Sequence, residues 1–519
     1  MAGKLDRRAF LAGAGAAAAA GVSPRPSLAA TDGHGAGGLE YRSASELLGM
    51  LADKRVSAVE LVDSSISRIE ALDAKTNAVV VRDFDRARAA AQGADAALAR
   101  GERRPLLGLP MTVKEQFNVV GLPTTWGDAK YRDWRPDADA LAVQRLKAAG
   151  AIVIGKTNVP LNLTDWQSFN EVYGTTNNPY DLGRTPGGSS GGAAAALAAG
   201  FVPLELGSDI GGSLRAPAHF SGVFSHKPTL DLVPQRGAGP PQAPAVPVRG
   251  DLAVLGPMAR SAVDLALELE VLAGPDELAE GIGYKLALPP PRHDKLTDFR
   301  VLIVDAHPLC PTANSIGAAV QGLAEHLGKL GCHVAHKSAK LPDLAQTSRI
   351  YRELLSAFFS ADLPPEIRER VETAANALSP DDQSLAAYSL RGLTISHPEW
   401  IRRSRLRAAL RARWLALFQE IDVVLCPPMP TAAFRHDHSP QFARKLDIDG
   451  TNVPYNDQSV WVGIATLNGL PATTMPIGRT DGGLPIGVQI IGGYLEDRTT
   501  IAFADLVERE FGGFTPPPI

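Results

Sequence analysis

Two serines in glycine-rich surroundings are the residues of this chain best placed to do chemistry. Ser189 stands within Gly187–Gly191, and Ser213 directly follows Gly211 and Gly212. Because glycine lacks a Cβ, backbone N–H groups can converge beside each serine. Successive inward N–H groups form a concave anion site, which suits the oxyanion of an acyl-transfer reaction. For Ser213, the predicted donors are the amides of Ile210, Gly211, Gly212 and Ser213 itself.

The first serine loop also admits a different interpretation. Residues 187–191 satisfy the G-x-S-x-G nucleophile elbow, which would make the chain an α/β-hydrolase-type esterase that uses Ser189. That motif follows a buried strand directly, whereas residues 180–186 are rich in turn formers. The elbow also leaves the loop at Ser213 unexplained. Taken alone, Ser189 or Ser190 would be interpreted as an N-cap of the alanine-rich helix that follows.

Taken together, these residues resemble the amidase signature family. The stretch Gly187–Ala218 carries the central motif, in which both serine loops stand at a fixed spacing. Lys114, at the end of the apolar run Leu109–Val113, matches the catalytic lysine of that family. Shorter stretches extend the resemblance over most of residues 40–500, namely Gly155–Asn158, Asn178–Pro179, His226–Thr229, Gly469–Ala472 and Gly483–Gln489.

The resemblance implies a Ser–Ser–Lys triad that hydrolyses the C–N bond of a carboxylic amide. By matching position, Ser213 is the nucleophile that forms the acyl-enzyme, Ser189 is the bridging serine held by a cis peptide bond, and Lys114 is the base. A lysine accepts a proton only when it is neutral, and burial at a strand end lowers its pKa. Ser189 would then relay a proton between Lys114 and Ser213, and later toward the leaving amine.

Other residues near the motif are interpreted as support or as substrate contacts. We expect Asp209 and Arg215 to hold the nucleophile loop by charge-assisted hydrogen bonds, with Ser190 in a similar structural role. Three aromatic residues are candidate apolar contacts for substrate, although a role as core aromatics is equally supported; they are Trp126, Trp166 and Phe169. The favoured substrate is an apolar or aryl amide, or a related carbamate or ester.

Composition and charge exclude several other partners. The formal net charge of −4 offers no basic excess to neutralise phosphates, so we expect no nucleic-acid partner. We expect no cofactor and no metal, since the tight ligand cluster His436-Asp437-His438 lies in a polar stretch that predicts a solvated loop. A non-catalytic periplasmic binding protein is the alternative from another class. It would predict the loss of a triad residue, and all three are present.

Residues 1–30 have the features of an export signal. Arg7-Arg8 precede Ala9-Phe10-Leu11 and the weakly apolar run Ala12–Val22, and this order resembles a twin-arginine signal. The run is too short and too poor in large apolar side chains to span a membrane, so we expect no stable membrane insertion. Residues 31–519 are then a single amidase domain in the periplasm or outside the cell.

Export bears on the partners that the resemblance offers. Some members of the resembling family are glutamine-hydrolysing subunits of transamidases that act on charged tRNA. Export argues against that role, because both tRNA and the partner protein of such a transamidase are cytosolic. A homodimer is compatible with the resemblance, although no segment of the sequence identifies an interface.

Helices and strands alternate around the predicted catalytic residues. Helical periodicity predicts two helices in residues 43–73 and further helices over 84–98, 138–149, 193–199, 315–330 and most of 343–420. Apolar runs predict strands at 109–114, 151–155, 201–206, 299–304, 332–336, 423–425 and 488–491. Residues 234–249, rich in Pro and Gly, predict a surface loop. This alternation is typical of the α/β class, and the resemblance implies a large mixed β-sheet core surrounded by helices.

Overall fold

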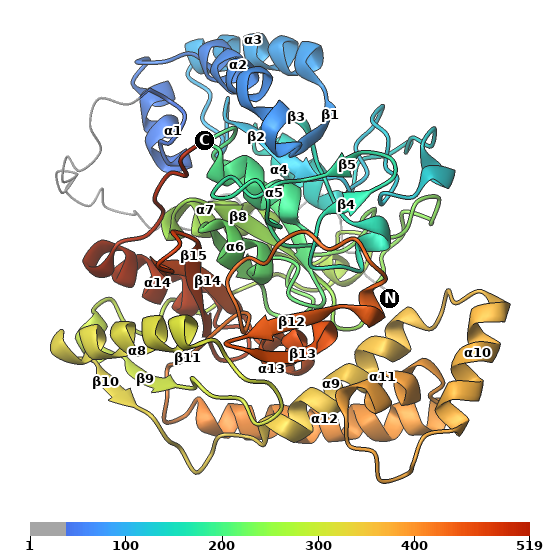
Figure 1. Ribbon diagram of the computed structural model, residues 1–519. Helices are drawn as coiled ribbons and strands as arrows, with labels where there is room; N and C mark the ends of the chain where they lie inside the picture. The colour runs from blue at the N-terminus through green and yellow to red at the C-terminus, as the bar shows by residue number, and fades with distance from the viewer. Residues whose placement is uncertain (1–37) are drawn as a thin grey trace, which may run out of the picture. The chain divides into compact units, whose positions relative to one another are not determined.

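A mixed β-sheet forms the centre of the fold (Figure 1). The structure, a computed structural model, describes residues 38–519, and the predicted signal segment of residues 1–30 lies outside the described residues. Within residues 38–519 this sheet has 11 strands, in the order β1 (Val79–Arg82), β3 (Ile152–Thr157), β2 (Pro110–Lys114), β6 (Leu204–Asp209), β8 (Val254–Ala259), β7 (Phe224–Lys227), β14 (Ala472–Arg479), β15 (Pro485–Ile491), β11 (Val423–Cys426), β9 (Arg300–Ile303) and β10 (His333–Ala335). The predicted class, a large mixed sheet surrounded by helices, is confirmed.

The strands that carry the candidate site run parallel to one another. β2 pairs in parallel with β3 on one side and with β6 on the other, so the carboxyl ends of all three meet at one edge. Antiparallel pairs then connect β6 through β8, β7, β14 and β15 to β11. β9 and β10 complete the sheet with parallel pairs. Every residue of β2, β3 and β6 is buried, as expected for parallel strands that are covered on both faces.

Helices cover the sheet along its length (Figure 1). The α-helices of residues 38–519 are α1 (Ala44–Ala52), α2 (Ala58–Thr76), α3 (Phe84–Ala99), α4 (Leu141–Ala148), α5 (Gly191–Ala198), α6 (Arg215–Ser221), α7 (Ala262–Leu272), α8 (Asn314–Lys329), α9 (Leu344–Phe359), α10 (Pro365–Asn376), α11 (Leu385–Leu393), α12 (His397–Leu417), α13 (Val460–Asn468) and α14 (Asp497–Phe511). Figure 1 shows α9 to α12 gathered in the lower part of the view.

Short elements complete the described chain. Two-stranded ribbons pair β4 (Phe169–Asn170) with β5 (Gly174–Thr175) and β12 (Lys445–Ile448) with β13 (Thr451–Pro454). Single 3₁₀ turns lie at Ala129–Tyr131, Leu161–Leu163, Glu280–Ile282, Leu296–Asp298, Gln441–Ala443 and Tyr455–Ser459. No regular element lies between β7 and β8, which agrees with the loop predicted for residues 234–249.

Local sequence explains where several helices begin. Ser43 caps α1 and Ser57 caps α2, and each is completed as a capping box by the glutamate three residues later. Alanine makes up most of α5, and every residue of that helix is buried. Because alanine has the highest helix propensity and no bulk beyond Cβ, this helix can pack closely against its neighbours on all sides.

Two features of the sheet differ from the sequence-based prediction. The strand predicted at 201–206 begins at Leu204 and continues to Asp209, because residues 204–209 pair with β8 from Ala259 to Val254. The strands β1, β7, β8 and β14 were not predicted at all. β1 and β7 have only four residues each, and β8 and β14 contain proline, so none has the run of alternating apolar residues that identifies a strand.

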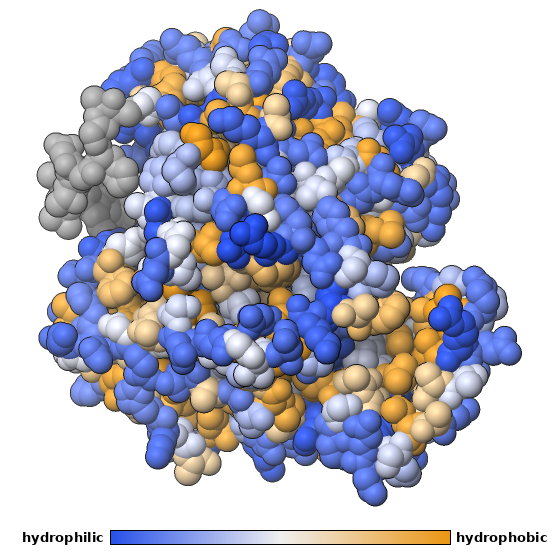
Figure 2. All heavy atoms as spheres, viewed as in Figure 1, coloured by the Kyte–Doolittle hydropathy of each residue, from blue (hydrophilic) through white to orange (hydrophobic). Residues whose placement is uncertain are grey.

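Among residues 38–519, no helix is both long enough and apolar enough to cross a bilayer. Figure 2 shows apolar side chains scattered among hydrophilic ones over the visible face.

Asp422 is a buried carboxylate whose replacement should weaken the fold. It precedes β11 and accepts hydrogen bonds from the Arg300 amide at 2.8 Å and from the Arg292 and Arg300 guanidinium groups at 2.9 and 2.7 Å. These partners outweigh the effect of burial and hold the pKa of Asp422 well below its usual range. We expect Asp422→Asn to lower the free energy of unfolding by about 3 kcal/mol at pH 7, measured by urea denaturation.

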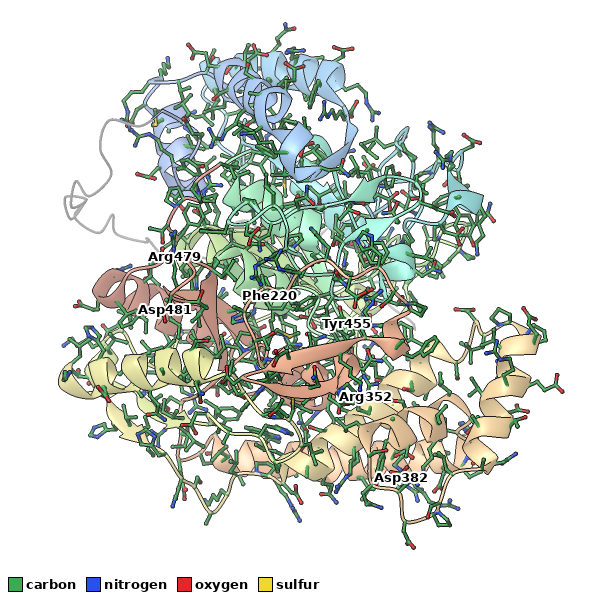
Figure 3. The ribbon with its side chains drawn as sticks, in the orientation of Figure 1. Phe220, Arg352, Asp382, Tyr455, Arg479 and Asp481 are labelled. Atoms are coloured by element: carbon green, nitrogen blue, oxygen red, sulfur yellow. The ribbon has the colours of Figure 1, made fainter. Side chains whose placement is uncertain are left out.

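The same variant has a predictable pH dependence. A depressed carboxyl pKa stabilises the folded state above the pKa of the unfolded chain, near 3.9, and this contribution is lost as the pH falls through the folded pKa. The difference between wild type and Asp422→Asn should therefore shrink below about pH 4. Asp481→Asn, in an exposed turn (labelled in Figure 3), is the control and should leave the unfolding midpoint unchanged. Equal unfolding midpoints for wild type and Asp422→Asn at pH 7 would contradict the conclusion that the Asp422 carboxylate stabilises the fold.

Candidate active site

The carboxyl ends of β2 and β6 bring the predicted triad residues to one edge of the sheet. Lys114 is the last residue of β2, and β6 leads into the loop that carries Ser213. Ser189 lies just before α5, and the Ser190 amide donates to the Ser213 carbonyl at 3.2 Å, which joins the two serine loops. The peptide bond between Gly188 and Ser189 is cis, as the resemblance implies.

Lys114 is fully buried, and its hydrogen-bond partners are hydroxyl groups. Its Nζ lies 2.6 Å from Ser189 Oγ and 2.8 Å from Ser208 Oγ. It forms no salt bridge with any carboxylate in residues 38–519. Because burial removes water from the ammonium group, it lowers the pKa of Lys114 to about 7. A large fraction of the Lys114 side chains is therefore neutral at neutral pH.

Ser208 and Gln116 complete the surroundings of Lys114, and the sequence analysis missed both. Ser208 Oγ donates to Gln116 Oε1 at 2.5 Å, and Gln116 Nε2 donates to the Ala238 carbonyl at 2.8 Å. Because the hydroxyl hydrogen of Ser208 is engaged in the hydrogen bond to Gln116, its oxygen can only accept from Lys114. One N–H of the amine is thereby directed to Ser208, and the lone pair of neutral Lys114 remains for Ser189. The proximity of Gln116 to Lys114 in sequence was an available signal.

Two buried carboxyl groups near Lys114 have very different charge states. Glu205, on β6, accepts from Thr112 Oγ1 at 2.5 Å, and burial raises its pKa to about 8. Asp209 is also buried, which alone would raise its pKa, but the Arg215 guanidinium outweighs burial and lowers it. In its ionised form, each carboxyl raises the pKa of Lys114, but burial lowers this pKa by more. Glu205 is thus mostly neutral at pH 7, and the charge of Asp209 is compensated by Arg215.

Asp209 and Arg215 fasten the nucleophile loop to the core. The Asp209 carboxylate accepts hydrogen bonds from two nitrogens of the Arg215 guanidinium, Nε at 3.0 Å and Nη2 at 2.9 Å. Neither side chain is exposed. The remaining guanidinium hydrogens go to the Val462 carbonyl, Gln489 Oε1 and Thr466 Oγ1. A bidentate pair with every donor used is the arrangement in which buried charges stabilise a loop. These contacts match the supporting role predicted for both residues.

The amide groups of the loop are not all available to a ligand. Gly212, one of the predicted oxyanion-hole donors, gives its N–H to Asp209 Oδ1 at 2.9 Å, so this amide is already occupied. The reason is the side chain of Asp209, which turns back onto the loop. The N–H groups of Ile210, Gly211 and Ser213 make no hydrogen bond within residues 38–519. Gly212 has φ +93°, and a Cβ there would lie 2.7 Å from Val462 Cγ1, so only glycine fits.

The hydroxyl groups of Ser213 and Ser190 differ in their accessibility. Ser213 Oγ has no hydrogen-bond partner in residues 38–519, and the residue is mostly buried, with 7% of its surface exposed. Ser190 is fully buried and stands at the N-cap position of α5 without capping it through its side chain. Instead, Ser190 Oγ donates to the Ser208 carbonyl at 3.3 Å, which ties α5 to β6.

The three candidate aromatic residues all have partners within the protein. Trp166 is buried, and its indole Nε1 donates to the Gly211 carbonyl at 2.8 Å. Trp126 donates to the Gln116 carbonyl at 3.2 Å. Phe169 stacks on His438 with a centroid distance of 4.0 Å. Trp166 thus acts on the nucleophile loop, which its sequence position did not reveal.

The loop that contains His436 and His438 packs against the segment around Phe169. The two histidine rings lie 5.9 Å apart in an edge-on arrangement. In the part of the chain that the structure describes, no group of three or more His, Cys, Asp or Glu side chains is arranged to hold a metal ion. Nearby, the hydroxyl of Tyr455 (labelled in Figure 3) donates to Asp165 Oδ1 at 2.7 Å. Asp165 directly precedes Trp166 in the sequence.

Comparison with known proteins decides the family. The Amidase family model matches residues 60–501. This chain belongs to the amidase family. It is therefore a hydrolase-type enzyme that acts on carbon–nitrogen bonds of amides, and its 11-stranded sheet matches the fold of solved amidase signature enzymes.

Relatives within the family have different activities. The chain is 33% identical over 500 residues to fatty-acid amide hydrolase 2-A of Danio rerio, covering 92% of this chain and 90% of the relative. It is 33% identical over 485 residues to a component of the glutamyl-tRNA(Gln) amidotransferase of Roseiflexus castenholzii, covering 89% and 94%. A solved bacterial aryl acylamidase of the amidase signature family has a TM-score of 0.76 and 25% identity, covering 91% of this chain and 96% of that one.

Arg215→Lys should destabilise this amidase although the charge is kept. Lysine has a single ammonium group and cannot reproduce the fork on Asp209 or the three further hydrogen bonds. We expect the free energy of unfolding to fall by about 3 kcal/mol, measured by urea denaturation. Arg413→Lys, at an exposed position on α12, is the matched control and should leave the midpoint unchanged. If both variants unfold at the wild-type midpoint, the Asp209–Arg215 pair does not anchor the loop.

Proposed function

We propose that this enzyme hydrolyses carboxylic amides through an acyl-enzyme on Ser213, with Ser189 as proton relay and Lys114 as base. The observation that carries the proposal is the distance of 2.6 Å between Lys114 Nζ and Ser189 Oγ, at a lysine that burial keeps partly neutral. An ordinary ammonium group could not accept the proton that this chemistry must move. The hydroxyl of Ser213, which has no hydrogen-bond partner in residues 38–519 and lies on the loop joined to Ser190, is the proposed nucleophile.

The Lys114–Ser189 contact supports the first proton transfer of the proposed reaction, and the transfer from Ser213 to Ser189 is part of the proposal. Neutral Lys114 accepts the Ser189 proton as Ser189 takes the proton of Ser213, whose oxygen attacks the amide carbonyl carbon. The amide N–H groups of Ile210, Gly211 and Ser213 are free to stabilise the resulting oxyanion. The relay then returns the proton to the leaving amine as the C–N bond breaks. Water hydrolyses the acyl-enzyme by the same route and regenerates Ser213.

We further propose that the substrate is an apolar or aryl amide, or a related carbamate or ester. Relatives named as a fatty-acid amide hydrolase and an aryl acylamidase support this class. The amidotransferase relatives are equally similar in sequence, so similarity alone does not separate the two activities. The twin-arginine features of residues 1–30 favour the hydrolase, because an exported enzyme does not meet charged tRNA.

Ser213→Ala should abolish turnover and covalent labelling. The oxygen of an activated serine attacks the phosphorus of a fluorophosphonate and displaces fluoride, so peptide mapping of the adduct by mass spectrometry identifies the nucleophile directly. We expect one adduct, on Ser213, that is absent from Ser213→Ala, while an amide substrate is turned over at least about 1,000-fold more slowly by the variant. An adduct on Ser189 would instead support the nucleophile-elbow interpretation. Full turnover by Ser213→Ala would exclude Ser213 as nucleophile.

The pH dependence of kcat/KM should report the neutral lysine. Because the base must be unprotonated and the pKa of Lys114 is about 7, kcat/KM should fall about tenfold per pH unit below pH 7 and level off above it. Glu205 is mostly protonated below pH 7, so Glu205→Gln keeps a neutral side chain there and should leave the position of the fall nearly unchanged. A profile that is flat between pH 5 and 8, with the chemical step shown to limit the rate, would contradict Lys114 as base.

A further inference from the structure

Three consecutive peptide units lead from Ile210 to Ser213, and they differ in whether the carbonyl alone or both the carbonyl and the N–H is hydrogen-bonded. The carbonyl of Ile210 accepts from Tyr351 Oη at 3.0 Å, and the carbonyl of Gly212 accepts from the Ala216 amide at 2.7 Å. The N–H groups of the same two peptide units, those of Gly211 and Ser213, make no hydrogen bond within residues 38–519. Each of these units is therefore fixed through its oxygen while its donor stays available.

The peptide unit between them is held at both ends. Its carbonyl, on Gly211, accepts from Trp166 Nε1 at 2.8 Å, and its N–H, on Gly212, donates to Asp209 at 2.9 Å. This unit can neither rotate nor contribute a donor. The arrangement leaves Gly211 N–H and Ser213 N–H as two free donors separated by one occupied amide.

Because the peptide bond between Ile210 and Gly211 is planar, the hydrogen bond from Tyr351 to the Ile210 carbonyl also fixes the direction of the Gly211 N–H. In a trans peptide the C=O and N–H bonds point in opposite directions. With the Ile210 carbonyl directed at the buried Tyr351 hydroxyl, the Gly211 N–H must point away from that side chain. If the contact is lost, the Ile210–Gly211 unit is free to rotate, and the donor loses its direction.

Tyr351 is itself rigidly placed for this role. It lies on α9, far from the serine loops in sequence, and its side chain is fully buried. Its ring packs directly against Gly463 of α13, where a Cβ would approach Tyr351 Cδ1 to 2.4 Å. Figure 3 labels Arg352, the next residue of α9, whose guanidinium binds Ser389. Burial raises the pKa of Tyr351, so its hydroxyl remains a donor at neutral pH.

We propose that Tyr351 is a positioning residue of the oxyanion hole, which orients the Gly211 N–H toward the developing oxyanion through the Ile210 carbonyl. The inference rests on the proposed function, since it assumes that an oxyanion forms at Ser213. It links the helical part of the molecule, α9 to α12, to the efficiency of the chemical step. Trp166 supports the same geometry by fixing the adjacent peptide unit.

Tyr351→Phe tests the proposal, because it removes only the hydroxyl. We expect kcat to fall by about ten- to a hundredfold, less than the loss of a donor itself, with KM nearly unchanged. The inhibition constant of a trifluoromethyl ketone, which forms a tetrahedral oxyanion with the catalytic serine, should rise by the same factor. Binding of an intact amide substrate, measured in the Ser213→Ala background, should be unaffected.

Controls separate this role from a general structural one. In Tyr180→Phe the lost hydroxyl also donates to a backbone carbonyl, that of Thr515, outside the site, so kcat and ketone inhibition should match the wild type. Trp166→Phe should weaken ketone inhibition, as Tyr351→Phe does. The melting temperature of each variant is recorded, so that a loss of folded protein is not counted as a loss of catalysis.

Two results would overturn the proposal. One is wild-type kcat and ketone inhibition in folded Tyr351→Phe. The other is an equal weakening of ketone and substrate binding, which would indicate a general disturbance of the pocket. Failure of the proposed function is distinguishable, because then the wild-type enzyme itself would show no ketone inhibition and no fluorophosphonate adduct on Ser213.

Discussion

The burial of Lys114 among hydroxyl groups is the constraint on which the site depends. A lysine in contact with a carboxylate would remain an ammonium ion, and its value as a base would be lost. Here the nearby carboxyls are prevented from pairing with it, since Glu205 is kept mostly neutral by burial and Asp209 is paired with Arg215. The parallel strands β2 and β6 allow Lys114 to be buried in this way, because both strands are covered on both faces of the sheet. Lys114 ends β2, and the chain continues from the end of β6 into the loop of Ser213.

The Asp209–Arg215 pair has a second consequence for the loop that follows β6. By taking the Gly212 amide, Asp209 leaves alternate N–H groups free, those of Gly211 and Ser213. The same carboxylate therefore compensates a buried charge and decides which amides can meet an oxyanion. Preorganised donors of this kind need no reorganisation when charge develops, which is the main source of electrostatic stabilisation in acyl transfer.

Sequence reasoning reached the parts of the site that depend on local pattern. The glycine-flanked serines, the lysine after an apolar run and the Asp209–Arg215 support are all contained in short segments. The sheet was predicted where strands are longer apolar runs, as in β2 and β3, and missed in the four-residue strands β1 and β7 and in the proline-containing β8 and β14. The hydrogen bonds of Tyr351 and Trp166 to the loop were not predictable, because they join residues far apart in sequence and leave no periodic pattern.

The titration of Lys114 in the folded enzyme tests this account most directly. With lysine ¹³C-labelled at Cε, the resonance that disappears in Lys114→Met identifies the residue, and its chemical shift can be followed with pH. The structure also places Lys156 and Lys227 in buried sites, so this assignment is essential. We predict a midpoint near 7 for Lys114. A midpoint near the usual lysine value of about 10.4 would contradict a neutral base at this position.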